Sequence, residues 1–87
     1  MSNKIVNAIR TLVMTPTQKF VLHCLADEAN DQGVCWPSVA AIMEKTCMGE
    51  RTVRRAIADL ETLGLVHADR RSGRATSYDL SPAMQVA

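Results

Sequence analysis

The segment from Glu50 to Leu63 constrains the fold more than any other part of this chain. On a helical wheel, with about 100° between successive residues, its apolar side chains gather on one side. These side chains are Val53, Ala56, Ile57, Leu60 and Leu63. The opposite side carries Arg51, Arg55, Ala58 and Thr62, with Arg54 flanking them. Gly64 follows, and glycine readily ends a helix, so the pattern predicts an amphipathic helix over 50–63.

An earlier helix is predicted to start at Thr15. Thr15 can act as the N-cap, and Pro16 takes the first helical position, where its missing N–H costs nothing. Gln18 then completes a capping box. We expect this helix to run to Asn30 and to end at Asp31-Gln32-Gly33. Its predicted inward-facing residues are Phe20, Val21, Cys24, Leu25 and Ala29.

A short strand, a helix and a tight turn are predicted between these two helices. Val34-Cys35-Trp36 is bounded by Gly33 and Pro37 and is too short for a helix, so a brief strand is expected. Pro37-Ser38 opens a helix over 38–45, and Thr46-Cys47-Met48-Gly49 connects it to the next one. In the predicted helix over 38–45, the residues available for burial are Val39, Ala40, Ile42 and Met43. Two helices joined by a turn of this length form a helix-turn-helix.

Beyond Gly64 the hydrophobic period changes to that of strands. Residues 65–69 and 76–80 are predicted to pair as a hairpin around 70–75, where Gly73 supplies the freedom that a turn requires. The strand at 34–36 would add a third strand and cover one edge of the hairpin. The predicted fold class is mainly α with a small β-hairpin: a winged helix-turn-helix with three core helices, a short strand and a two-stranded wing.

The predicted domain spans 15–80, and the two ends of the chain lie outside it. Residues 1–14 are predicted to form an extra amphipathic helix, because Ile5, Ile9, Leu12 and Val13 share one stripe. This helix could lie on the domain or, through residues 1–13, form a homodimer. Ser81-Pro82 breaks the second hairpin strand, and 81–87 is expected to be a frayed tail.

Composition limits the classes of protein that fit. A chain of 87 residues makes one domain, and with one Phe, one Tyr and one Trp its core must be aliphatic. No apolar run approaches the roughly 20 residues that span a bilayer, and no signal-peptide pattern is present. A cytoplasmic protein without membrane association is therefore expected. The odd number of cysteines, with no Cys-x-x-Cys pair, fits buried thiols in a reducing compartment rather than a zinc site.

No sequence feature predicts an enzyme. His23 and His67 have no neighbouring signal for a nucleophile or a metal, and no glycine-rich loop could cradle a phosphate. We therefore expect no catalytic residues, metal, cofactor or small-molecule ligand.

Positive charge is concentrated in the second half of the chain. Residues 51–74 hold six arginines against three acids, although the net charge of the chain is only +1. The planar guanidinium group suits phosphates and guanine edges. A helix that enters the major groove needs an apolar back, long donors near its N-terminus and small residues further along. The helix at 50–63 meets these requirements, so double-stranded DNA is the predicted partner.

The predicted DNA-binding residues lie on this helix and on the wing. They are Arg51, Thr52, Arg54, Arg55, Arg70, Arg71 and Arg74. Thr52 would donate to a phosphate and the wing arginines would follow the backbone or the minor groove. Two alternatives stay open for the helix. Arg54 could instead pair with a carboxylate on its own helix, and Glu50 could accept from a cytosine amino group, pair with Arg54 or favour the helix N-terminus.

Several segments resemble a family of phage-associated winged helix-turn-helix domains. The matching segments are 15–22, 26–33 followed by Cys35-Trp36-Pro37-Ser38, and 51–57 with 60–66. The resemblance covers about residues 15–80 and extends to the N-terminal DNA-binding domains of phage proteins similar to replication protein O. It implies that Arg51, Thr52 and Arg55 contact DNA. Gly49 stands where the family often has a capping Ser, which removes a hydroxyl that could touch phosphate.

The resulting functional hypothesis is sequence-specific DNA binding by a transcription regulator or a replication initiator. The alternative is a winged helix that binds another protein without reading bases, because fold alone does not determine function.

Overall fold

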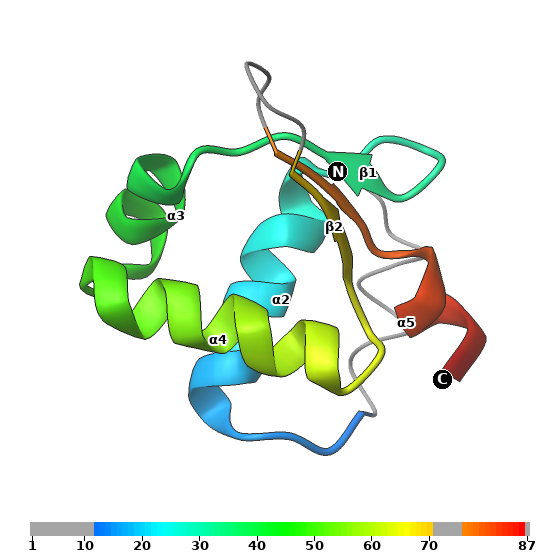
Figure 1. Ribbon diagram of the computed structural model, residues 1–87, viewed down its shortest axis with the longest axis horizontal. Helices are drawn as coiled ribbons and strands as arrows, with labels where there is room; N and C mark the ends of the chain where they lie inside the picture. Colours follow the sequence, from blue (N-terminus) through cyan, green and yellow to red (C-terminus); the bar gives the residue numbers. More distant parts are fainter. Residues whose placement is uncertain (1–11, 71–75, 87) are drawn as a thin grey trace.

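The computed structural model describes residues 12–70 and 76–86 (Figure 1). Its elements, in chain order, are α2 (Pro16–Glu28), β1 (Val34–Cys35), α3 (Val39–Thr46), α4 (Glu50–Thr62), β2 (His67–Asp69), β3 (Ser77–Asp79) and α5 (Ser81–Val86). The three helices α2, α3 and α4 pack on one another, and the small sheet lies beside them (Figure 1). This is the predicted winged helix-turn-helix.

The helix starts follow from their capping residues. The Thr15 side chain accepts from the Gln18 backbone N–H at 3.2 Å, and the Gln18 side chain accepts from the Thr15 N–H at 3.2 Å. The predicted capping box is therefore confirmed. Ser38 caps α3 by accepting from the Ala41 N–H at 3.0 Å. These bonds satisfy backbone donors that the first turn of a helix leaves unpaired.

The turn between α3 and α4 begins at Cys47, which takes the left-handed conformation with φ 58° and ψ 30°. Thr46 is buried just before it, and its hydroxyl donates to the Ile42 carbonyl at 2.7 Å. The left-handed residue reverses the chain within a few residues, so that α4 starts at Glu50 as predicted.

The sheet has the strand order β1-β3-β2, and both pairings are antiparallel. Cys35 lies opposite Tyr78 in one pairing, and Ala68 lies opposite Tyr78 in the other. The prediction that the short strand joins the hairpin is confirmed. The strands are shorter than predicted at their ends, because Leu65 and Val66 belong to the buried turn that leaves α4.

The core is aliphatic, as composition required, and its largest fully buried side chains come from all three helices and the sheet. They are Leu22, Leu25, Ile42, Leu60, Leu80, Val21, Val53 and Cys35. Three residues predicted for the core are corrected, and one of them, Ala40 on α3, is exposed. Phe20 is 51 % exposed because the buried side of α2 centres on Leu22 and Leu25. Leu63 is 52 % exposed because it follows the last residue of α4, where the chain turns away.

Both ends of the chain differ in secondary structure from the prediction, as far as the structure describes them. Residues 81–86 form α5 rather than a frayed tail, because a proline in the first turn is compatible with a helix. The Asp79 side chain accepts from the Ser81 N–H at 2.9 Å, and Ala83 is fully buried. Most of the helix predicted over 1–14 lies outside the described residues, and residues 12–14 are not helical.

Within the described part of the chain, no helix combines the length and the apolar character needed to cross a bilayer.

Candidate nucleic-acid interface

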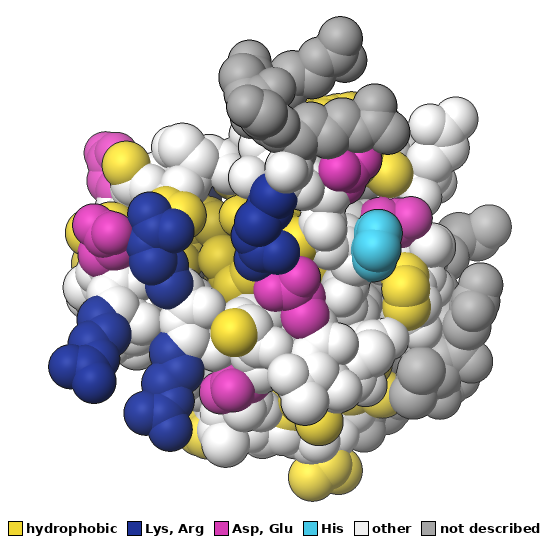
Figure 2. Space-filling view, viewed as in Figure 1, with side chains coloured by type: hydrophobic (Ala, Val, Ile, Leu, Met, Phe, Trp, Pro, Cys, Tyr) yellow, Lys and Arg dark blue, Asp and Glu magenta, His cyan; other side chains and the backbone are white. Residues whose placement is uncertain are grey.

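The two sides of α4 have opposite character. Its inward side is closed, with Val53, Ala56, Ile57 and Leu60 each at most 2 % exposed. Its outward side presents Arg51, Thr52, Arg55 and Ala58 to solvent. Figure 2 shows Lys and Arg side chains gathered on the part of the surface where α4 lies. The predicted orientation of the guanidinium groups, away from the interior, is thus confirmed.

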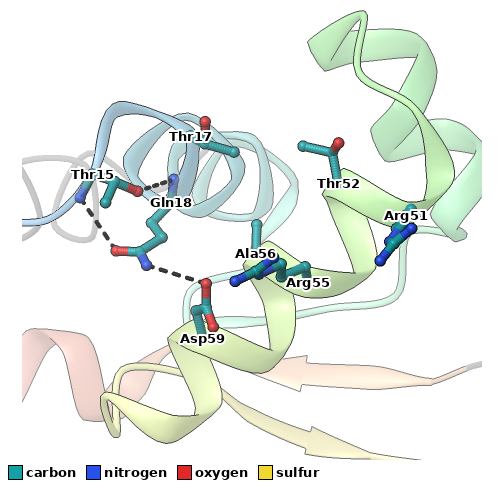
Figure 3. Close-up of a pocket in the computed structure, with 8 residues that line it drawn as sticks. All are labelled: Thr15, Thr17, Gln18, Arg51, Thr52, Arg55, Ala56 and Asp59. Carbon is teal, nitrogen blue, oxygen red and sulfur yellow. Dashed lines mark hydrogen bonds between the residues drawn. The ribbon is translucent and has the colours of Figure 1, made fainter.

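A polar hollow separates the exposed side of α4 from the first turn of α2. Its volume is about 310 Å³ and it is open to solvent. The residues that line it are Thr15, Thr17, Gln18, Arg51, Thr52, Arg55, Ala56 and Asp59. Arg51 and Thr52 come from the first turn of α4, whereas Asp59 lies two turns further along and faces Gln18 (Figure 3). The hollow therefore has a cationic end and an acidic end.

Gln18 connects the two helices that border this hollow. Its side-chain amide donates to the Asp59 carboxylate at 3.3 Å, while its carbonyl oxygen accepts from the Thr15 N–H (Figure 3). One side chain therefore both caps α2 and bonds to α4. The amide that donates to Asp59 is neutral, so the carboxylate keeps its negative charge at this end of the hollow. Neither Arg51 nor Arg55 forms a salt bridge with a carboxylate in the part of the chain that the structure describes.

Arg54 does form an ion pair on its own helix. Its Nε donates to Glu50 Oε2 at 2.8 Å, and both side chains are about 60 % exposed. Of the roles left open for Glu50, the structure therefore shows the ion pair with Arg54. A solvent-exposed pair four residues apart contributes only about 0.3–0.5 kcal/mol. Arg54 could therefore leave Glu50 and donate to another acceptor at little cost in free energy. The bond uses Nε and leaves the two terminal nitrogens of Arg54 available.

Arg70 is held more firmly, in a pair that joins two elements. Its Nη1 and Nη2 donate to Glu61 Oε1 and Oε2, each at 2.9 Å. Accepting these bonds from Arg70 lowers the pKa of the Glu61 carboxyl, and donating them raises the pKa of Arg70. Two parallel bonds of this kind have a defined geometry as well as energy. Arg71 and Arg74, the other predicted wing contacts, lie outside the described residues.

The N-terminus of α4 has no side-chain cap. Gly49 occupies the N-cap position, and its carbonyl accepts the first helical bond from the Val53 N–H at 3.0 Å. The backbone N–H groups of the first turn are therefore uncapped by any side chain. Such groups, together with the partial positive charge of the helix terminus, favour a phosphate.

The opposite end of α4 is closed by the backbone. Gly64 has φ +75°, its N–H donates to the Glu61 carbonyl at 3.0 Å, and the Leu65 N–H donates to the Leu60 carbonyl at 3.0 Å. This pair of bonds, with Leu60 and Leu65 both buried, is a Schellman motif. It confirms the predicted helix end at Gly64 and points the chain toward β2.

The cysteines do not gather into a site. Burial raises the pKa of Cys24 and raises that of Cys35 to about 12, so both stay protonated thiols. The expectation of buried thiols is wrong for Cys47, which is exposed in the turn before α4 because it takes the left-handed position at the end of α3. Among the described residues, no three His, Cys, Asp or Glu side chains converge as a metal site would require.

Two contacts of this surface were not predicted from the sequence: the bond from Gln18 to Asp59 and the pair of Arg70 with Glu61. Gln18 was recognisable as a capping residue, but its bond to Asp59 joins positions 41 residues apart. From the sequence, Glu61 is a possible partner only for Arg54 or Arg55 on its own helix. Both contacts depend on how the helices and the sheet pack, which no local pattern encodes.

Comparison with known proteins agrees with this geometry. A family described as "helix-turn-helix domain" matches residues 12–66. The chain is also 50 % identical over 58 residues to protein YmfN of Escherichia coli (strain K12). The aligned segment covers 66 % of this chain and 13 % of that protein. No solved structure matches. The chain thus corresponds to a small part of the length of this relative. With its helix-turn-helix formed by α3 and α4 and its β2–β3 wing, the chain belongs to the helix-turn-helix domain family, and this membership indicates DNA binding.

Proposed function

We propose that this domain binds double-stranded DNA sequence-specifically, with the N-terminal half of α4 in the major groove. The observation that carries the proposal is the exposure of Arg51 and Arg55 on the side of α4 opposite its buried residues, without a carboxylate partner in the described part of the chain. An arginine that no carboxylate neutralises is free to donate both of its terminal nitrogens to a guanine edge.

The shape of α4 supports entry into the groove. The major groove is about 12 Å wide and admits an α-helix. Ala58 and the uncapped Gly49 add no bulk to the exposed side, so the helix can approach the base edges closely. Arg51 and Arg55 are one turn apart and can reach neighbouring base pairs.

Backbone phosphates fit the cationic end of the hollow between α2 and α4. Thr52 supplies a hydroxyl there, Thr17 supplies another from α2, and the first-turn N–H groups of α4 add donors. Asp59 repels phosphate at the other end, so the DNA strand would follow the rim beside Arg51. Arg54 can add a contact through its terminal nitrogens while it keeps its bond to Glu50.

The wing would lie beside the DNA, where Arg71 and Arg74 are expected to meet the backbone or the minor groove. The domain would serve a transcription regulator or a replication initiator, in keeping with its resemblance to phage replication proteins. Both roles use the same recognition surface, so the same binding measurement applies to either.

The experiment is a selection from randomised duplexes, followed by fluorescence anisotropy on the selected and a scrambled duplex. We expect the affinity to fall with salt with a log–log slope of about −4 to −6, given about 0.9 per phosphate contacted. Arg51→Ala should cost the selected duplex about 1–3 kcal/mol and relax its base preference. Thr62→Ala is the control, because Thr62 is exposed on the same helix three turns away and should leave the preference intact.

Two outcomes would contradict the proposal. Binding that ignores both sequence and salt would favour the alternative, a winged helix that recognises another protein. Equal effects of Arg51→Ala and Thr62→Ala would remove Arg51 from base readout.

A further inference from the structure

Arg70 stands at the base of the wing, directly after β2, and its guanidinium is bound to the last turn of α4. Both carboxylate oxygens of Glu61 and two nitrogens of Arg70 take part, at 2.9 Å each. Glu61 is the less exposed partner, with 28 % of its side chain accessible against 56 % for Arg70. The bond joins residues nine positions apart and closes the corner between α4 and the hairpin.

The other support at this corner is apolar, because Leu60, Leu65 and Tyr78 belong to one buried core. α4 packs principally against α2 and α3, and its close backbone approaches to β2 and β3 are few. The hairpin is held in the fold by β1 and by the buried turn at Leu65 and Val66. The Arg70–Glu61 pair therefore adds a polar link between the recognition helix and the wing to this apolar packing.

The location of the pair argues against contact between Arg70 and the base edges of the major groove. Glu61 lies eleven residues after Glu50, which places it about 16 Å along the helix axis from the N-terminus that would enter the groove. The carboxylate also cancels the local charge that would attract a phosphate.

We infer that Arg70 is a positioning residue, which through Glu61 sets the angle between α4 and the wing and so lets both reach the DNA together. This inference rests on the proposed DNA binding and gives Arg70 a role other than the direct contact predicted from sequence. Arginine is required for it, because lysine has a single ammonium group and cannot form two parallel bonds with one carboxylate.

Three variants separate positioning from phosphate contact. Arg70→Lys keeps the charge and loses the paired bonds. Glu61→Gln removes the acid. The double variant Glu61→Arg with Arg70→Glu reverses the pair and keeps the net charge. Each is measured for affinity on the selected duplex, for its salt slope, and for amide hydrogen exchange in β2 and β3 without DNA.

We expect Arg70→Lys and Glu61→Gln each to weaken DNA binding by about threefold to fivefold, the upper range for an exposed ion pair. The salt slope should stay unchanged, exchange in β2 and β3 should quicken, and the reversed pair should restore affinity to within about twofold of the original, a difference smaller than one such pair contributes.

A phosphate-contacting Arg70 predicts the opposite pattern. Glu61→Gln would then tighten binding, Arg70→Lys would bind nearly as well as the original, and the reversed pair would lose about 0.9 from the salt slope. That pattern, or equal binding by all four proteins, would overturn the inference while leaving DNA binding intact. Failure of the unaltered protein to bind any duplex would instead overturn the proposed function, and the inference with it.

Discussion

α4 makes two kinds of contact with the rest of the domain: buried apolar packing against α2 and α3, and a partly exposed ion pair with Arg70 at the base of the wing. Toward α2 and α3, it buries Val53 and Leu60 completely. Toward the hairpin, it offers Glu61 to Arg70 in a partly exposed pair. Apolar burial hardly responds to salt or pH, whereas an exposed ion pair responds to both. The helical bundle thus fixes where the recognition helix lies, and the charged contact adjusts how the wing meets it.

The largest effect should come from the apolar side. Leu60→Ala is expected to lower the free energy of unfolding by about 2–5 kcal/mol, because it removes a fully buried side chain and leaves a cavity. Leu63→Ala is the matched control, since Leu63 is 52 % exposed and its truncation should change stability by about 0.5 kcal/mol or less. Urea unfolding of both variants measures the difference, and equal losses would show that α4 is not anchored as described.

A smaller effect is expected at the two glycines that flank α4. Gly64→Ala should cost about 1 kcal/mol, because φ +75° at this position strains any residue with a Cβ. Gly49→Ser should instead be neutral or stabilise by a few tenths of a kcal/mol, because φ is −72° there and an added Cβ meets nothing within 4 Å. Thermal melts compare the two, and a loss at Gly49 as large as that at Gly64 would contradict this assignment of the helix ends.

The smallest effect should come from the charged side, and it should depend on pH. Accepting bonds from Arg70 lowers the pKa of Glu61 below 4.5 in the folded state. The pair therefore stabilises the fold fully above pH 4.5 and loses this contribution as the pH falls through the lowered pKa. The difference in stability between the unaltered protein and Glu61→Gln, at most about 1 kcal/mol at neutral pH, should shrink in acid. Denaturant unfolding of both proteins from pH 7 to pH 3 measures this difference in stability. Glu44→Gln, on the exposed side of α3, is the control. A difference between the unaltered protein and Glu61→Gln that stays constant with pH would contradict the pairing.

The features predicted correctly from sequence are those that local chemistry determines. Thr15, Ser38 and Gly64 mark helix ends because each satisfies or frees backbone groups within a few residues. The stripe on α4 was readable because the apolar and the charged residues fall on clearly separate sides.

The features that sequence did not reveal depend on packing between distant segments. α2 is covered by α3, α4 and β1, so a single wheel could not tell that Leu22 would be buried and Phe20 exposed. The pairing of Arg70 with Glu61 required the angle at which the hairpin leaves α4. Ser81-Pro82 was correctly read as the end of a strand, but nothing local signalled that Ala83 would find a place in the core.

The position of β3 in the middle of the sheet sets a practical limit on where this unit can be cut. The family match stops at residue 66, yet β1 and β2 pair with β3 and not with each other. A fragment trimmed at that boundary would keep the recognition helix but leave β1 without a neighbouring strand and the core without Tyr78 and Leu80. Grafting or expressing this module on its own therefore calls for a segment that extends to at least Ala83.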